Sequence, residues 1–251
     1  MIHTLMHAVL KQAVKEGILG RNPAAAVERP KVEQTERQIL TEEQVRQLIF
    51  TTTNTRYGTL IYMALITGMR EGELLGLKWS DVDWTRGQLF VQRQLQKKKG
   101  DGNGLVPPKT KAGVRHIKLG QGTLDRLVKH REQQGLQKAA NGSRWQENDL
   151  IFPNTIGKPE SSRNMYEDYK HLLSENGLPD INFHALRHTA LSHLLDMGTP
   201  VNTVQRWAGH SKASVTTDTY GHSLAHAEDE AAERLEELFY PVPIDVKLMS
   251  K

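Results

Sequence analysis

The pattern of apolar positions along the chain predicts a mostly helical protein. Residues 2–17 carry Ile, Leu and Val at roughly helical spacing, and the continuous apolar run at 60–66 indicates a buried helix. A further helix is expected over 162–176, ending at Gly177. Leucines and alanines between 224 and 238 trace one apolar stripe opposite acidic residues, which predicts an amphipathic helix.

Other features mark where helices begin and end. The segment Thr41-Glu42-Glu43-Gln44 precedes apolar residues and has the capping-box pattern, which predicts a helix start. Apolar residues after Gly120 predict another helix, and the polar stretch from about 133 to 149 predicts a loop after it.

Short segments in the middle of the chain favour strands. Residues 88–92 and 114–119 have the composition and length of strands, and residues around 94–97 add to them. Together they predict a small antiparallel sheet. The expected fold is therefore mainly α with a small three-stranded antiparallel β-sheet, an α+β arrangement.

Charge is distributed unevenly along the 251 residues, although the net charge is only +4. Between Arg86 and Lys118 the charged residues are basic except for Asp101, whereas those between 224 and 239 are acidic except for Arg234. Such asymmetry predicts a polyanionic partner for the basic region.

The composition also excludes several classes of site. The chain has no cysteine, so disulfides, thiolate zinc sites and cysteine nucleophiles are excluded. No apolar run reaches the length of a membrane span, and no secretory signal pattern opens the chain. We therefore expect a cytoplasmic protein without a membrane partner.

The candidate chemistry is concentrated between His184 and Tyr220. On a helix, His184 and Arg187 lie about one turn apart and share a face. A proton carrier beside a fixed cation suits a phosphate, which a tyrosine phenol could attack. An alternative is that His184 and His188, spaced i,i+4, bind a metal. No glutamate stands beside them and no third ligand is obvious, so no metal is expected.

Four segments carry a resemblance to one protein family. In chain order they are TGMREGELLGLKWSDVD, PKTKAGVRHIKL, HALRHT and WAGHSKASVTTDTY. They resemble the signature boxes of the tyrosine recombinase (phage integrase) family over roughly residues 38–225. The resemblance implies that family's catalytic-domain fold over 31–240. It also implies that residues 1–30 are the last helix and linker of a truncated core-binding domain, and that 241–251 form a C-terminal tail.

The resemblance implies a set of phosphate-binding residues. Arg70, Arg187 and His210 would stabilise charge on the scissile phosphate, although Ala208 stands where the family more often has leucine. Glu73 would orient Arg70. Spacing alone favours a solvated Arg70 that pairs with Glu71 or Glu73, and the resemblance reverses this preference.

The remaining implied roles concern bond breaking and proton transfer. Tyr220 would attack the phosphate and form a 3′-phosphotyrosyl bond, and His184 would assist proton transfer at the phenol. Lys111 would protonate the departing 5′ oxygen, with Lys109 as the alternative lysine. Because the bond energy stays in the protein–DNA link, the implied mechanism needs neither ATP nor a metal, and no cofactor is expected.

The basic region is expected to lie along double-stranded DNA and to contact its backbone. The residues expected to make these contacts are Lys97, Lys98, Lys99, Lys109 and Arg115. For Lys97–Lys99 a solvated charged loop is the alternative. The acidic C-terminal helix could pack on a neighbouring subunit of a tetramer on DNA, or on its own core. Directionality factors and host DNA-bending proteins are possible further partners.

Three functions fit these observations. The first is a site-specific integrase or recombinase of a phage or mobile element. The second is a DNA-binding module that does not cleave, and the third is a type IB topoisomerase-like enzyme. The complete set of candidate residues with Tyr220 favours catalysis, and the helix and linker at 1–30 favour a recombinase over a topoisomerase.

Overall fold

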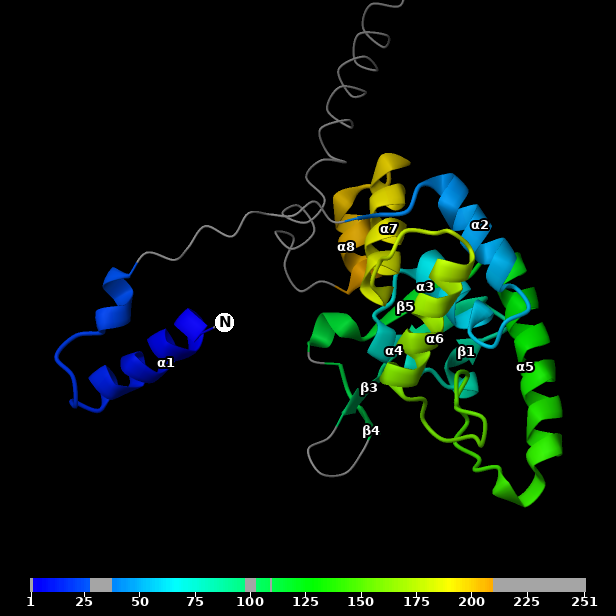
Figure 1. Ribbon diagram of the computed structural model, residues 1–251, viewed down its shortest axis with the longest axis horizontal. Coiled ribbons are helices and arrows are strands. Elements are labelled where there is room, and N and C mark those ends of the chain that lie inside the picture. The colour runs from blue at the N-terminus through cyan, green and yellow to red at the C-terminus, as the bar shows by residue number, and fades with distance from the viewer. Residues whose placement is uncertain (1, 28–37, 98–102, 109, 210–251) are drawn as a thin grey trace, which may run out of the picture. The chain divides into compact units, whose positions relative to one another are not determined.

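The computed structural model describes residues 2–27, 38–97, 103–108 and 110–209, with the backbone alone at Lys111. The chain divides into two compact units, Met1–Glu36 and Arg37–Lys251, and each is considered by itself (Figure 1). No helix in the described ranges is long and apolar enough to cross a membrane. The helix predicted over 224–238 lies outside the described residues.

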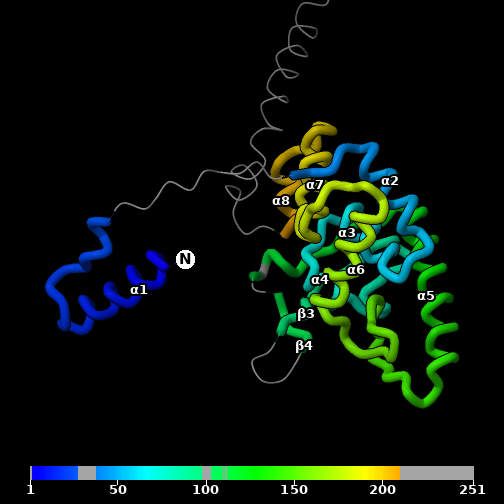
Figure 2. Tube along the Cα trace, viewed as in Figure 1, coloured from blue at the N-terminus to red at the C-terminus, as the bar shows by residue number. Residues whose placement is uncertain are grey.

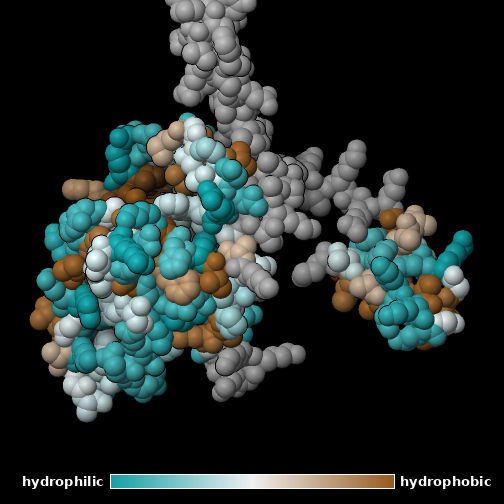
Figure 3. Space-filling view, turned by 180° about the vertical axis from the view of Figure 1, so that it is seen from behind, coloured by the Kyte–Doolittle hydropathy of each residue, from teal (hydrophilic) through white to brown (hydrophobic). Residues whose placement is uncertain are grey.

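The first unit contains the helix predicted over 2–17, which ends at Lys15, and a short 3-10 helix. These are α1 (Ile2–Lys15) and η1 (Pro23–Ala26). The Asn22 side chain begins η1 by accepting from the Ala24 amide and donates to the His7 carbonyl. Helix α1 buries none of its residues, and apolar side chains reach the surface of this unit (Figure 3).

Helices make up most of the second unit. They are α2 (Glu42–Thr52), α3 (Gly58–Thr67), α4 (Glu71–Leu75), α5 (Gln121–Asn141), α6 (Ser162–Glu175), α7 (Phe183–Asp196) and α8 (Val201–Ala208), with short 3-10 helices η2 (Trp79–Asp81), η3 (Lys111–Gly113) and η4 (Gly142–Arg144). The predicted capping box at Thr41 is confirmed, since the Thr41 hydroxyl accepts from the Gln44 amide and the Gln44 side chain accepts from the Thr41 amide.

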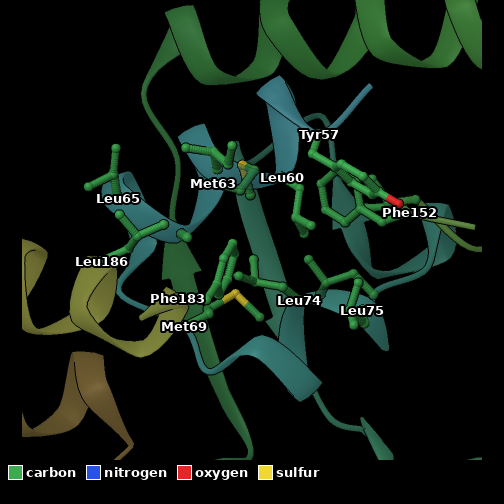
Figure 4. Close-up of a cluster of buried hydrophobic side chains, with 14 of the residues drawn as sticks. Tyr57, Leu60, Met63, Leu65, Met69, Leu74, Leu75, Phe152, Phe183 and Leu186 are labelled. Atoms are coloured by element: carbon green, nitrogen blue, oxygen red, sulfur yellow. The ribbon is translucent and has the colours of Figure 1, made fainter. Parts of the chain in front are cut away.

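Helix α3 lies at the centre of the core. The run predicted to be a buried helix is α3, whose apolar residues are buried except for Tyr62 and Ile66, and α3 packs against α7. Figure 4 shows Leu65 of α3 beside Leu186 of α7, and Phe183 beside Leu74 of α4. This core fixes the ends of α3, α4 and α7 relative to one another, and the candidate site is built from those ends.

The prediction of a polar loop from about 133 was wrong, because α5 continues to Asn141. Its later residues are mostly polar but include good helix formers such as Gln, Lys and Ala. Gln134 also accepts a hydrogen bond from the Trp79 indole and donates to the Leu150 carbonyl. Polar side chains therefore hold this part of α5 to the domain, and a search for apolar periodicity misses it.

The main sheet has three antiparallel strands in the order β1 (Val82–Asp83), β2 (Gln88–Val91) and β5 (Arg115–Lys118). Val82 pairs with Leu89, which pairs with Ile117, and all three are buried. The count of three strands is confirmed.

The prediction that residues 94–97 supply the third strand was wrong. They form β3 (Gln94–Lys97), which pairs with β4 (Asn103–Val106) in a separate two-stranded hairpin. The chain leaves the main sheet after Val91, because the side chains of Gln92 and Arg93 both donate hydrogen bonds to the Asp81 carboxylate. The hairpin lies on α4 (Figure 2). A Cβ atom at Gly72 of α4 would stand 2.8 Å from the Leu95 carbonyl oxygen, so glycine permits this close approach.

Candidate functional site

Helix α7 carries two of the predicted site residues. Asn182 begins this helix by accepting a hydrogen bond from the Ala185 amide at 2.9 Å. His184 is exposed, whereas Arg187, one turn later, is buried. The rings of His184 and His188 pack edge to face with centroids 4.7 Å apart. In the described ranges no group of three or more His, Asp or Glu residues could hold a metal ion.

The Arg187 guanidinium joins the ends of two helices. It donates to the Gly68 carbonyl at 2.6 Å, just beyond α3, and to the Ala208 carbonyl at 2.8 Å, at the end of α8. The Trp207 indole also donates to the Thr67 carbonyl at 2.8 Å. Carbonyls in the last turn of a helix lack intrahelical partners, so these donors satisfy groups that would otherwise need water.

Arg70 and Glu73 lie together at the start of α4. Both the Arg70 amide and its guanidinium donate to Glu73, at 3.0 and 2.9 Å. The Glu73 side chain is 2% exposed and the Arg70 side chain is 38% exposed. Glu73 thus holds one edge of the Arg70 guanidinium, while the Arg70 side chain remains partly exposed.

Arg115 was expected along an exposed DNA-contacting surface, and the structure corrects this placement. Its side chain is only 7% exposed, and its Nη2 donates to Glu73 at 3.0 Å. Its Nε donates to the Trp207 carbonyl at 2.7 Å and its Nη1 to the Gly113 carbonyl at 3.1 Å. Arg115 therefore belongs to the interior.

The strand pattern contained a signal for this burial. In β5, Arg115 and Ile117 are buried while His116 and Lys118 are exposed. Successive side chains of a strand point to opposite faces, so an arginine two residues from a core isoleucine faces inward. The two-residue period would have separated Arg115 from the lysines of the basic region.

Two arginines determine the ionisation of Glu73. Burial by itself would raise the pKa of the Glu73 carboxyl, but the hydrogen bond and charge of Arg115 oppose this, and so do those of Arg70. The arginines prevail and hold the pKa below its usual value. Glu73 is therefore ionised at neutral pH.

These contacts form a closed ring. From Arg70 it passes through Glu73 to Arg115, then to the end of α8, to Arg187, and back to Gly68, which precedes Arg70 by two residues. The ring joins parts of all four segments singled out in the sequence. It also lies directly beside Gly209, the residue before His210.

The remaining predicted residues are placed only in part. Lys97 is exposed at the end of β3, and the backbone of Lys111 begins η3. Lys98, Lys99, Lys109, His210 and Tyr220 lie outside the described residues. The roles predicted for these residues, like those for the ring residues, stay predictions.

A family model and several relatives match this chain. The model described as the phage integrase family matches residues 38–226. A tyrosine recombinase XerC-like protein of Caldanaerobacter subterraneus is 30% identical over 95% of this chain and 65% of its own length. The ICEBs1 integrase of Bacillus subtilis is 27% identical over 94% of this chain and 64% of its own. The chain thus spans just under two thirds of these curated relatives.

Solved structures share the fold at low sequence identity. The Tn1549 transposon integrase, in complex with transposon right end DNA, has a TM-score of 0.78 and 22% identity, covering 91% of this chain and 76% of that one. A lambda integrase dimer bound to a core site has a TM-score of 0.60 and 21% identity, covering 87% and 57%. The expected catalytic-domain fold is confirmed.

Proposed function

Because the chain belongs to the phage integrase family, we propose that it is a site-specific DNA recombinase that cuts and rejoins DNA through a 3′-phosphotyrosyl intermediate. The observation that carries the proposal is the ring of contacts that brings Arg70 and Arg187 together with the residue before His210. Three segments far apart in sequence thereby meet at one place. Such convergence suits the binding of a single phosphate.

In the proposed reaction the Tyr220 phenol oxygen attacks the scissile phosphorus. A new O–P bond forms, the bond to the 5′ oxygen breaks, and the phenol proton passes toward His184. Lys111, or Lys109 in its place, gives a proton to the departing 5′ oxygen. Attack by a 5′ hydroxyl of a partner strand then releases the tyrosine and joins the new strands.

Charge stabilisation falls to the arginines and His210. A guanidinium presents fixed donors that match phosphate oxygens, and donors held in place before the reaction stabilise developing charge most effectively. Arg70 suits this role because Glu73 fixes one edge of its guanidinium and the side chain remains partly exposed. The mechanism uses no metal, ATP or other cofactor.

We further propose double-stranded attachment sites as substrate and a tetramer as the active assembly. Directionality and host DNA-bending factors are possible partners, and a cytoplasmic location follows from the substrate. Lys97–Lys99 and Lys109 would contact the DNA backbone. Residues 1–30 would be the end of a core-binding domain, 31–240 the catalytic domain and 241–251 a tail. The two compact units divide close to the first of these boundaries.

A covalent-adduct assay on supercoiled plasmid tests the proposal without knowledge of the attachment site. The parent protein should leave DNA attached to protein after detergent denaturation, in the presence of chelator, and Tyr220→Phe should leave none. Binding should be nearly equal for the two proteins, because the substitution removes only the nucleophilic oxygen.

Other outcomes would identify a different function. DNA binding without an adduct from either protein would indicate the non-cleaving module. Plasmid relaxation without strand exchange would indicate the topoisomerase-like enzyme, and loss of the adduct with chelator would contradict a metal-free reaction.

A further inference from the structure

We propose that Arg115 is a positioning residue for leaving-group protonation, because it holds η3, the turn that begins with Lys111, against Glu73 and the end of α8. The inference rests on the proposed recombinase function. It assigns Arg115 no contact with DNA and places its effect in one chemical step, proton donation to the 5′ oxygen.

The Arg115 guanidinium binds three different segments at once. Its Nη1 and Nη2 reach the two Glu73 carboxylate oxygens at 3.3 and 3.0 Å, Nη1 also reaches the Gly113 carbonyl, and Nε reaches the Trp207 carbonyl. A planar guanidinium has five N–H donors in a rigid fork, whereas an ammonium is a compact point charge. Lysine could keep the charge here but could not hold all these acceptors together.

The contact to Gly113 connects Arg115 to the leaving-group lysine. Gly113 is the last residue of η3 and Lys111 is the first. The turn spans three residues, so fixing the carbonyl at its end restricts the backbone at its start. Lys109, the alternative donor, precedes the same turn by two residues.

The end of α8 supplies the fixed side of this arrangement. Trp207 and Ala208 carry carbonyls in the last turn of α8, and Arg115 and Arg187 each donate to one of them. A Cβ atom at Gly209 would stand 2.8 Å from Arg115 Nη1 and 3.0 Å from the Ala112 carbonyl oxygen. The turn and the helix end are thus in direct contact, with Arg115 between them.

A purely structural role for Arg115 gives a different expectation from a positioning role. A buried ion pair that only stabilises the fold would affect every step of the reaction equally when lost. A residue that positions the proton donor would affect cleavage only when the leaving group needs a proton. A 5′-bridging sulfur removes that need, since a thiol is far more acidic than an alcohol.

The experiment compares oxygen and sulfur leaving groups in one DNA duplex. The duplex copies the plasmid site that the parent protein cleaves most, with either atom bridging at the scissile phosphate. Cleavage rates are measured for the parent, Arg115→Lys and Arg115→Met, with thermal unfolding of each. Arg93→Met is the matched control, because Arg93 pairs with buried Asp81 in the same unit but lies outside the ring.

We expect Arg115→Lys, which keeps its charge beside Glu73, to fold and to cleave the oxygen duplex slower by on the order of 10²-fold. The same variant should cleave the sulfur duplex at a rate within about threefold of the parent, because a sulfur leaving group needs no general acid. Arg115→Met should show the same selectivity if it folds. Arg93→Met should change both rates by the same factor.

Equal losses on both duplexes at unchanged stability would overturn the inference and leave the proposed function standing. Full activity of Arg115→Lys on the oxygen duplex would overturn it as well. No cleavage of either duplex by the parent would instead overturn the proposed function, and the inference with it.

Discussion

The Glu73 carboxylate is shared by two guanidinium groups, and this determines where positive charge remains. Arg115 is buried and directs its other donors at carbonyls, whereas the Arg70 side chain is 38% exposed. One carboxylate against two guanidiniums leaves one net positive charge, and the exposed group is the one that an anion can reach. Glu73 therefore neutralises the interior without neutralising the site.

Replacing Glu73 by Gln should lower the free energy of unfolding by about 3 kcal/mol at neutral pH, because it leaves Arg115 buried without its counter-charge. The folded pKa of Glu73 lies below its ordinary value of 4.5, so its stabilisation is present above that pH and is lost as the pH falls below it. Chemical denaturation at pH 7 and pH 3 should show that the difference in free energy of unfolding between parent and variant is smaller at pH 3.

Glu42→Gln is the control, since Glu42 forms an exposed pair with Arg46 on α2. It should change stability by less than about 1 kcal/mol at either pH. If the difference in free energy of unfolding between the parent and Glu73→Gln stayed constant from pH 7 to pH 3, this would contradict the ionisation proposed for Glu73.

At this scale the sequence revealed neighbours within one segment but not partners across segments. Spacing predicted an ion pair of Arg70 with Glu71 or Glu73, and the family resemblance favoured Glu73, which is the residue that Arg70 contacts. The partnership of Glu73 with Arg115 bridges two segments, and it depends on how β5 packs against α4. Charge density alone placed Arg115 with the surface lysines, because counting basic residues ignores which face of the strand each one occupies.

Helix ends, rather than helix faces, bring the candidate site together. Gly68 and Gly209 end α3 and α8 in the left-handed conformation, with φ of 59° and 67°. At both positions the next residues lead directly into a predicted site residue, Arg70 or His210. Glycine takes this conformation without the steric cost that other residues bear, so it permits each helix to stop abruptly.

Gly209→Ala should reduce covalent-adduct formation by on the order of 10²-fold, because the added methyl would displace the turn of η3 or the end of α8. Gly198→Ala is the matched control. Gly198 has φ of 76° but no atom within 4 Å of an added Cβ, so it carries only the backbone cost of about 1 kcal/mol.

Adduct yield and thermal unfolding of the two glycine variants separate the displacement of η3 or α8 from the backbone cost of the substitution. Similar behaviour of both proteins would show that contact between η3 and α8 is unimportant for cleavage.

Elements of the fold were predictable where a pattern extends over several residues. Helix α3 and strand β2 follow from continuous or alternating apolar runs. Strand β1 has only two residues, Val82 and Asp83, too few to show a period of two. The turn between β1 and β2 brings these two strands together. The longer segment 94–97 was predicted to be the third strand, a position that β1 occupies.

On the scale of the whole molecule, the two compact units differ in how much of their apolar surface they bury. The described hydrophobic core of the second unit begins at Leu40. Helix α1 presents Ile2, Leu5 and Val9 at 81%, 66% and 57% exposure.

Because residues 2–36 belong to the first compact unit, deleting them should leave the unfolding of the second unit cooperative. Its thermal unfolding midpoint should stay within about 4 °C of that of the parent. A change of about 1 kcal/mol in the free energy of unfolding shifts the midpoint of a domain of this size by at most about 4 °C. Binding to plasmid DNA should weaken, because enzymes of this family are expected to clamp the duplex from both sides. Circular dichroism measures the first effect and salt-dependent competition binding the second.

Leu186→Ala provides the comparison for a true core loss. Leu186 is fully buried beside Leu65, and its truncation should lower the free energy of unfolding by about 2–5 kcal/mol. A deletion variant that lost stability on this scale would show that the first unit packs on the second. Unchanged stability with weaker DNA binding would show that residues 2–36 contribute to DNA binding and not to the stability of the second unit.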